Sequence, residues 1–297
     1  MNTQQSLQRA NLTGIFWMVA SMAAFAVEDA FIKAATKQLP VGQVLIFFGA
    51  GGAMLFAYLT RRSGSNLLGA QAYSKVMLIR AFCELIGRLF YVLAIALTPM
   101  SSATAILQAT PIIVVLGATA FFGETVGWRR WCSIVVGLIG VVIILRPATG
   151  DFSALSMLAV VGTLGFAGRD LASRAAPASL TTWLLGFYGF LTVVVAGTLF
   201  SLWDGKMFVW PTVANLMGLL AAVGAGVFAY TALMKAMRTG SISSVTPFRY
   251  TRLVFGITLG IVMFGERLDG PMILGCLVVI GSGLFIWWQG RVSAKTY

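Results

Sequence analysis

Ten apolar stretches, each about as long as a membrane-spanning helix, make up most of the 297-residue chain. A helix needs about 20 mostly apolar residues to cross the hydrocarbon core of a bilayer. The gaps between the stretches are too short to fold as soluble domains. The sequence therefore predicts an all-α integral membrane protein with about ten transmembrane helices, at residues 13–36, 43–60, 76–97, 102–122, 129–146, 154–173, 180–202, 212–236, 242–263 and 270–289.

The balance of charges supports this assignment. Only 10% of the residues are charged and 59% are hydrophobic, whereas soluble chains carry about 25% charged residues. The net charge of +12 does not indicate a nucleic-acid partner, because the basic residues lie mostly in the gaps between apolar stretches. With both termini in the cytoplasm, most of these basic residues fall on the cytoplasmic side, as the positive-inside rule requires. Eleven lie there (Arg9, Arg61, Arg62, Lys75, Arg129, Arg130, Arg174, Lys235, Arg238, Arg291 and Lys295) and four lie opposite (Lys37, Arg146, Lys206 and Arg267).

The residue types needed for the common catalytic and metal sites are missing. The chain contains no histidine, and Cys83, Cys132 and Cys276 lie inside apolar stretches without forming a CxxC pair. This excludes His-based catalytic triads and His-ligated metal sites. We therefore expect no enzyme activity, no cofactor and no bound metal.

Short motifs recur at an offset of 141 or 142 residues, which indicates an internal duplication. The pairs are Phe122-Gly123-Glu124 with Phe264-Gly265-Glu266, Ser101-Ser102 with Ser243-Ser244, and Asp29 with Asp170. We predict two copies of one unit, at 13–148 and 149–290, between short cytoplasmic termini at 1–12 and 291–297. Each copy has five spans, so the two copies must be inverted relative to one another. Inverted repeats are typical of secondary transporters, whose substrate site lies near the membrane midplane.

Ten helices in two copies, with an aromatic-Gly-Glu motif closing the fourth helix of each, resemble the EamA-type transporters of the drug/metabolite transporter superfamily. Length and helix number are similar to those of its bacterial amino-acid exporters, including aromatic amino-acid exporters of the YddG type. The resemblance implies a small-molecule substrate, transport without ATP and a bacterial inner membrane. It also implies a cavity lined by spans 3, 4, 8 and 9, with spans 1 and 6 moving as gates. The sequence indicates no oligomer and is compatible with a monomer.

Charged residues inside the apolar stretches are the candidate functional residues, because a charge in hydrocarbon needs a partner or an aqueous cavity. In the third span, Arg80, Glu84 and Arg88 share one helix face, and Tyr91 follows one turn later. Two interpretations stay open. The three charges form a structural ladder within the helix, or Glu84 and Arg88 face the cavity and bind the two ends of a zwitterion.

The ninth span carries Arg249 and Arg252 on one face, beside Phe248 and Tyr250. Two arginines this close repel unless an anion joins them. That anion is either Glu84 or the carboxylate of the substrate, which arginine binds in bidentate fashion. In the remaining interpretation, both side chains extend to the lipid headgroups.

The first and sixth spans carry related charges. These are Glu28, Asp29 and Lys33 in the first span and Arg169, Asp170 and Arg174 in the sixth. They act either as gates and proton-coupling groups or as salt bridges within each helix, since Lys33 and Arg174 lie one turn from the equivalent aspartates. Glu124 and Glu266 are interpreted as parts of the fold motif.

Polar and aromatic residues near mid-membrane complete the candidate list, with Gln108 and Pro111 in the fourth span and Tyr230 in the eighth. Pro111 is expected to kink its helix. Because its equivalent in the second copy is Leu253, that kink is expected to be asymmetric, and Pro247 in the first turns of the ninth span is expected to bend that helix differently.

We therefore predict an alternating-access exporter of small amphiphilic metabolites, most simply amino acids. The tyrosines Tyr91, Tyr230 and Tyr250 would form the cavity wall. The alternative of the same fold is an exporter of drugs or quaternary cations, which would need acidic or aromatic cages instead of paired arginines. A membrane-embedded enzyme and a passive channel are the other classes considered.

Overall fold

The structure is a computed structural model that describes residues 3–64, 67, 73–122, 127–145, 153–175, 180–239 and 245–293. Within these ranges the regular elements are helical and none is a strand. In chain order they are α1 (Thr3–Thr36), α2 (Val41–Arg62), α3 (Lys75–Leu97), α4 (Met100–Leu107), α5 (Thr110–Phe122), α6 (Trp128–Leu145), α7 (Ser156–Ala175), α8 (Thr182–Asp204), α9 (Val213–Thr239), the 3₁₀ helix η2 (Thr246–Tyr250), α11 (Thr251–Phe264) and α12 (Gly270–Ser293).

These elements reproduce the predicted spans, with the fourth span divided into α4 and α5 and the ninth into η2 and α11. The largest difference in length is at α1, which begins at Thr3 and not at residue 13. The polar residues ahead of the apolar stretch contain no proline or glycine, so nothing in them ends the helix.

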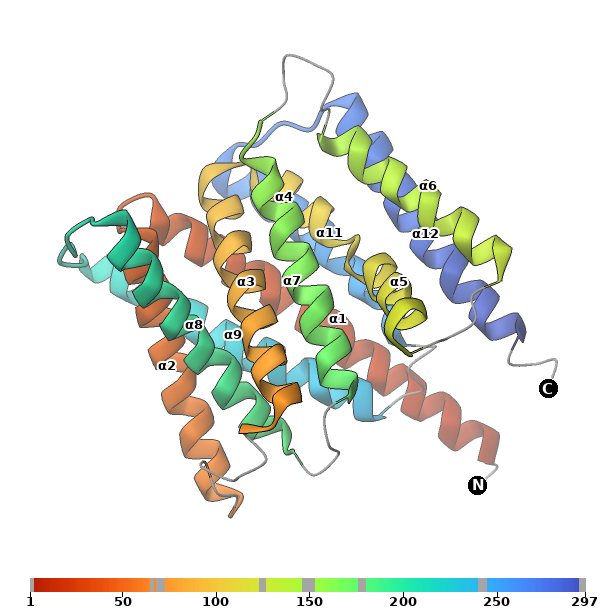
Figure 1. Ribbon diagram of the computed structural model, residues 1–297, viewed down its shortest axis with the longest axis horizontal. Coiled ribbons are helices and arrows are strands. Elements are labelled where there is room, and N and C mark those ends of the chain that lie inside the picture. Colours follow the sequence, from red (N-terminus) through yellow and green to blue (C-terminus); the bar gives the residue numbers. More distant parts are fainter. Residues whose placement is uncertain are drawn as a thin grey trace.

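The helices pack in pairs that join the two copies. The first and eighth spans pair as α1 and α9, and the third and sixth pair as α3 and α7. If each helix is replaced by its equivalent in the other copy, the α1–α9 pair becomes the α7–α3 pair. The α2–α8 and α6–α12 pairs are unchanged by the same replacement. This pattern is that of two inverted five-helix repeats related by a pseudo-twofold axis. The α6–α12 pair lies at one edge of the bundle (Figure 1).

Both chain ends lie on the same side of the bundle, at the lower right of Figure 1. We call this the N/C side, and the other the opposite side. An even number of spans requires this arrangement.

By length and composition, five helices in the described part of the chain are clear membrane spans: α1, α2, the α4–α5 unit, α8 and α9. The helices α3 and α7 are not among these five, and both carry charged residues, at 80–88 and at 169–174. Most of the charges on these two helices pair inside the bundle. Both helices coincide with predicted spans, at 76–97 and 154–173.

Candidate functional site

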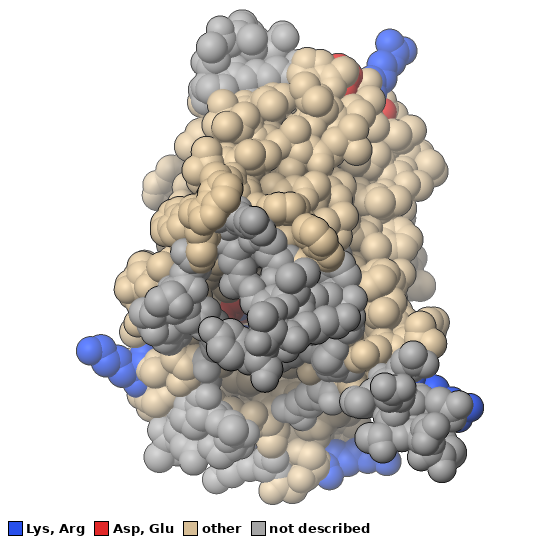
Figure 2. All heavy atoms as spheres, turned by 90° about the vertical axis from the view of Figure 1, so that its right-hand side faces the viewer, with Lys and Arg blue, Asp and Glu red and all other residues tan. Residues whose placement is uncertain are grey.

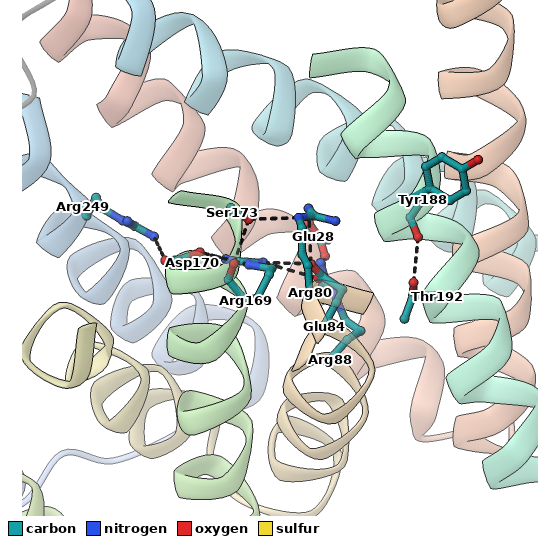
Figure 3. Close-up of polar contacts among 10 residues, drawn as sticks. All are labelled: Glu28, Arg80, Glu84, Arg88, Arg169, Asp170, Ser173, Tyr188, Thr192 and Arg249. Carbon is teal, nitrogen blue, oxygen red and sulfur yellow. Dashed lines mark hydrogen bonds and ion pairs between the residues drawn. The ribbon is translucent and has the colours of Figure 1, made fainter. Parts of the chain in front are cut away.

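The first group of charged side chains joins α3, α7 and η2 (Figure 3). We call it the arginine-rich cluster, and it consists of Arg80, Glu84, Arg169, Asp170 and Arg249. Glu84 lies 3.8 Å from Arg80 and 3.4 Å from Arg169. Asp170 lies 2.8 Å from Arg169 and 3.4 Å from Arg249. The cluster is therefore a chain of alternating charges that begins and ends on an arginine.

The second group lies deeper and joins α1, α3 and α11. We call it the central cluster, and it consists of Glu28, Asp29, Arg88, Tyr91 and Arg252. Arg88 contacts Glu28 at 2.5 Å, and Arg252 contacts Asp29 at 2.6 Å. The Tyr91 hydroxyl donates to Asp29 at 3.1 Å. Glu28 and Asp29 are almost completely buried, so each of these acids holds an arginine where an unpaired charge would be costly.

Aromatic rings cover both arginines of the central cluster. The guanidinium of Arg88 lies 5.5 Å from the ring of Phe48 and 5.9 Å from that of Phe166. The guanidinium of Arg252 lies 4.9 Å from the ring of Phe25. These distances are in the range of cation–π contacts, so the rings stabilise the arginines and exclude lipid from them.

The fourth helix is interrupted between α4 and α5, at Gln108–Ala109. Pro111 explains the interruption, because it has no N–H to donate to the carbonyl of Leu107 one turn back. The Thr110 hydroxyl donates to that carbonyl instead, at 2.6 Å. The backbone thus bends inside the membrane without leaving this carbonyl unpaired.

The ninth helix changes from 3₁₀ to α geometry at Tyr250–Thr251, the position equivalent to Gln108–Ala109. The 3₁₀ segment has Pro247 in its first turn, where the sequence predicts that this proline bends the ninth span differently from the fourth. Thr251 takes the same role as Thr110 and donates to the Phe248 carbonyl at 2.6 Å. The two irregular points also touch, through a 3.2 Å bond from the Gln108 amide to the Arg249 carbonyl. Interrupted helices that meet inside a bundle are where such transporters bind substrate.

Comparison with known proteins identifies the family to which this arrangement of helices belongs. The sequence matches the profile of the EamA-like transporter family twice, over residues 12–146 and 149–288. The chain belongs to this family. It is a multi-pass membrane transporter of small molecules.

Three curated relatives align along almost the whole transporter. It is 28% identical to a riboflavin transporter of Vibrio cholerae, over 98% of both chains. It is 23% identical to an S-adenosylmethionine uptake transporter of Rickettsia prowazekii over 96% of both, and 28% identical to a pseudopaline exporter of Pseudomonas aeruginosa over 90% of this chain and 93% of the relative. A solved structure titled "Crystal structure of protein" has a TM-score of 0.62, with 15% identity over 96% of this chain and 98% of the other, and supports the fold alone. The aromatic amino-acid exporter subtype stays a prediction.

The predicted ladder within α3 forms only in part. Arg80 and Glu84 pair, but Arg88 binds Glu28 on α1 and not Glu84. Neither arginine of the ninth span pairs with Glu84, since Arg249 contacts Asp170 and Arg252 contacts Asp29. The transporter therefore pairs most of these charges between helices.

The salt bridges expected within the first and sixth spans also differ. Lys33 lies 3.2 Å from Glu266, next to the end of α11, while Asp29 binds Arg252. The predicted partner of Asp170, Arg174, has a side chain outside the described residues, as has Glu124 of the first fold motif.

The other predicted aromatic residues have different surroundings. Tyr230 packs edge-on against Phe56 at 5.5 Å and interacts electrostatically with the arginine-rich cluster. Phe248 packs on the apolar cluster around Met18, whereas the ring of Tyr250 lies against Gly283 of α12. Of these three, Tyr230 interacts with four members of the arginine-rich cluster, and Tyr250 interacts with the fifth, Arg249.

Sequence reasoning missed several participants. Ser173 accepts a 2.9 Å bond from Arg80, and Glu266, interpreted as a fold motif, is the partner of Lys33. The rings of Phe25 and Phe166 were also missed as covers of the arginines. These two phenylalanines occupy equivalent positions in the two repeats, which was the available signal.

Proposed function

We propose that the transporter exports a small amphiphilic metabolite that bears a carboxylate, an amino acid, across the bacterial inner membrane by alternating access. The observation that carries this proposal is the charge balance of the arginine-rich cluster. Its described side chains comprise three arginines and two carboxylates, which leaves one positive charge without an acidic counterpart. A substrate carboxylate would complete the balance, and arginine is the side chain best suited to bind it.

Arg249 is the residue to which we assign this role. It makes a single long contact to Asp170, at 3.4 Å, and its side chain is 27% exposed. By contrast, the side chain of Asp29 in the central cluster is 1% exposed. Figure 2, which views the right-hand side of Figure 1, shows an acidic side chain set back from the surface of that face. Substrate would therefore enter from the N/C side and meet Arg249 first.

The direction of transport follows in this proposal from the orientation. In this proposal the N/C side is cytoplasmic, because its loops carry the excess of lysine and arginine that the positive-inside rule expects there, and substrate that enters from this side would leave the cell. The relatives are named for three different substrates, and both uptake and export occur among their names. Similarity to these relatives therefore selects neither the substrate nor the direction of transport. The charge balance of the arginine-rich cluster supports the substrate, and the charges of the loops support the direction.

Replacing Arg249 by glutamine is expected to raise the concentration for half-maximal amino-acid counterflow in proteoliposomes about 10- to 100-fold. A hydrogen bond to a charged group contributes about 1.5–3 kcal/mol, and each 1.4 kcal/mol is a factor of ten. Arg249→Lys should lie between the variant and the native transporter, because lysine keeps the charge but not the bidentate geometry.

The matched control is Lys206→Gln, since Lys206 is a basic residue whose side chain is 68% exposed in the loop before α9. Its kinetics should equal those of the native transporter. If no amino acid on a full panel exchanges, or if Arg249→Gln behaves as the native protein, the assignment fails. Competition by lipophilic cations would instead support the quaternary-cation exporter, and a rate that never saturates would indicate a channel.

Glu28 and Asp29 are the acids available for proton coupling, because they are adjacent on α1 and each keeps one buried oxygen without a described partner. The groups that face them are Arg88 from α3 and Arg252 from α11. A pH gradient imposed on proteoliposomes of the native transporter is expected to drive net amino-acid movement. A rate that ignores the gradient identifies a uniporter and removes this role from both acids.

A further inference from the structure

On the opposite side of the bundle, the N-terminus of α4 is capped by a residue of the other repeat. The Glu266 carboxylate accepts hydrogen bonds from the backbone N–H of Met100 at 2.6 Å and of Ser101 at 2.9 Å, and from the Ser101 hydroxyl at 2.6 Å. The N-cap position of α4 is Pro99, which makes no side-chain cap. The first N–H groups of a helix have no partner inside it and favour a negative charge. Glu266, just after the end of α11, supplies both the hydrogen-bond acceptor and the negative charge.

The backbone of the Phe-Gly-Glu motif explains how Glu266 reaches α4. Gly265 has a φ of +65°, a left-handed conformation that glycine adopts without strain. The Gly265 N–H donates to Ile261 and the Glu266 N–H donates to Gly260, both carbonyls of the last turn of α11. This C-cap reverses the chain. A Cβ at Gly260 would lie 2.5 Å from the Glu266 carboxylate, so the missing side chain leaves room for it.

Lys33 ties α1 into the same contact. Its ammonium lies 3.2 Å from Glu266 and donates to the Thr98 carbonyl at 2.6 Å. Lys33 and Lys37 also lie over the ring of Phe264, at 5.1 and 4.7 Å. The contact therefore connects α1 and α4 of the first repeat with the end of α11 in the second.

Glu266 is held in its charged form at neutral pH. Burial by itself would raise the pKa of this carboxyl, but the hydrogen bonds from Ser101 and Met100 and the charge of Lys33 bring the pKa below its usual value. The bonds of Glu266 are therefore charge-assisted, which makes them stronger than bonds between neutral groups.

We infer that Glu266 holds the opposite side of the transporter closed, and that its bonds to Met100 and Ser101 break each time that side opens. This inference rests on the proposed alternating-access mechanism, in which one side is closed while the other is open. The pattern of burial agrees, since Lys33 and Glu266 are about as buried as Arg88, whereas Asp170 and Arg249 of the arginine-rich cluster are partly exposed. Glu266 is thus assigned a part in the transport cycle, in addition to its part in the fold.

Thiol accessibility tests this without any substrate. Thr104 is completely buried and lies one turn further into the bundle than Ser101. A cysteine is placed there, with Cys83, Cys132 and Cys276 replaced by alanine, and a membrane-impermeant maleimide is applied from the opposite side. We expect labelling to be slow in this background and about tenfold faster with Glu266→Gln, which removes the charge from the bonds to α4.

Two further variants keep the test decisive if Glu266→Gln does not fold. Ser101→Ala removes the hydroxyl that donates to Glu266, and Gly260→Ala places a methyl group against the Glu266 carboxylate. Both variants should therefore also be labelled faster. The matched control is Asp204→Asn, which removes an acid from the end of α8 whose contact is the exposed Lys206, and should leave labelling unchanged. Unchanged or slower labelling in all folded Glu266, Ser101 and Gly260 variants would overturn the inference. Because the labelling assay needs no substrate, a counterflow panel in which no amino acid exchanges would contradict the proposed substrate without affecting this result.

Discussion

Asp29→Asn is expected to cost the transporter about 3–5 kcal/mol of stability, the usual penalty for removing one partner of a buried ion pair. Asp29 accepts bonds from Arg252 at 2.6 Å and from Tyr91 at 3.1 Å, and its side chain is 1% exposed. Without the aspartate charge, the guanidinium of Arg252 stays against the ring of Phe25 with no acid directly bound. The thermal transition of the detergent-purified protein measures the loss.

The double variant Asp29→Asn/Arg252→Gln tests whether the loss of stability comes from the unpaired charge of Arg252 or from the changed shape of the side chains. It removes both charges, so most of the lost stability should return. Asp204→Asn is the control for an exposed pair with Lys206, for which about 0–1 kcal/mol is expected. A single Asp29→Asn variant as stable as the native transporter would show that the central cluster does not need this charge.

Gly165→Ala is expected to destabilise the transporter by about 1–3 kcal/mol, the range for overpacking a close contact. A Cβ at Gly165 would lie 2.3 Å from the backbone nitrogen of Gly87 and 2.6 Å from its Cα. Backbone atoms cannot rotate away as a side chain can, so α3 and α7 must separate. That movement would also lengthen the 3.4 Å contact between Glu84 and Arg169, and counterflow should weaken along with the thermal transition.

The control is Gly224→Ala in α9, where a Cβ meets no atom within 4 Å. Alanine has a higher helix propensity than glycine, so this variant should be as stable as the native protein or slightly more stable. Equal losses in the two variants would mean that glycine in these helices matters for some reason other than the α3–α7 contact.

The spans and the duplication could be read from the chain because both are local properties. Whether a stretch such as 43–60 enters the membrane depends on its own residues, and α2 forms there. Equivalent motifs such as those ending in Glu124 and Glu266 report the repeat without any knowledge of contacts. The interruption of the fourth helix was also foreseeable from Pro111, and an irregular start of the ninth helix from Pro247, although the two prolines are not at equivalent positions of the repeats.

The partners of the charged side chains could not be predicted from the sequence. Spacing placed Glu84 and Arg88 on one face of α3 and Asp29 and Lys33 on one face of α1, which made partners within one helix the natural expectation. In the structure Arg88 binds Glu28 and Lys33 binds Glu266. A helical pattern defines which face a charge occupies but not which helix lies opposite that face.

The sequence by itself thus determined which segments enter the membrane and that the protein is built from two inverted copies, because hydrophobic transfer depends on the composition of each segment. Tertiary structure decided which acid neutralises which arginine, and with it which arginine we propose for the substrate. The physical reason is that a buried charge is stabilised by whatever group packing brings within a few ångströms, and packing joins residues as distant in the chain as Asp29 and Arg252.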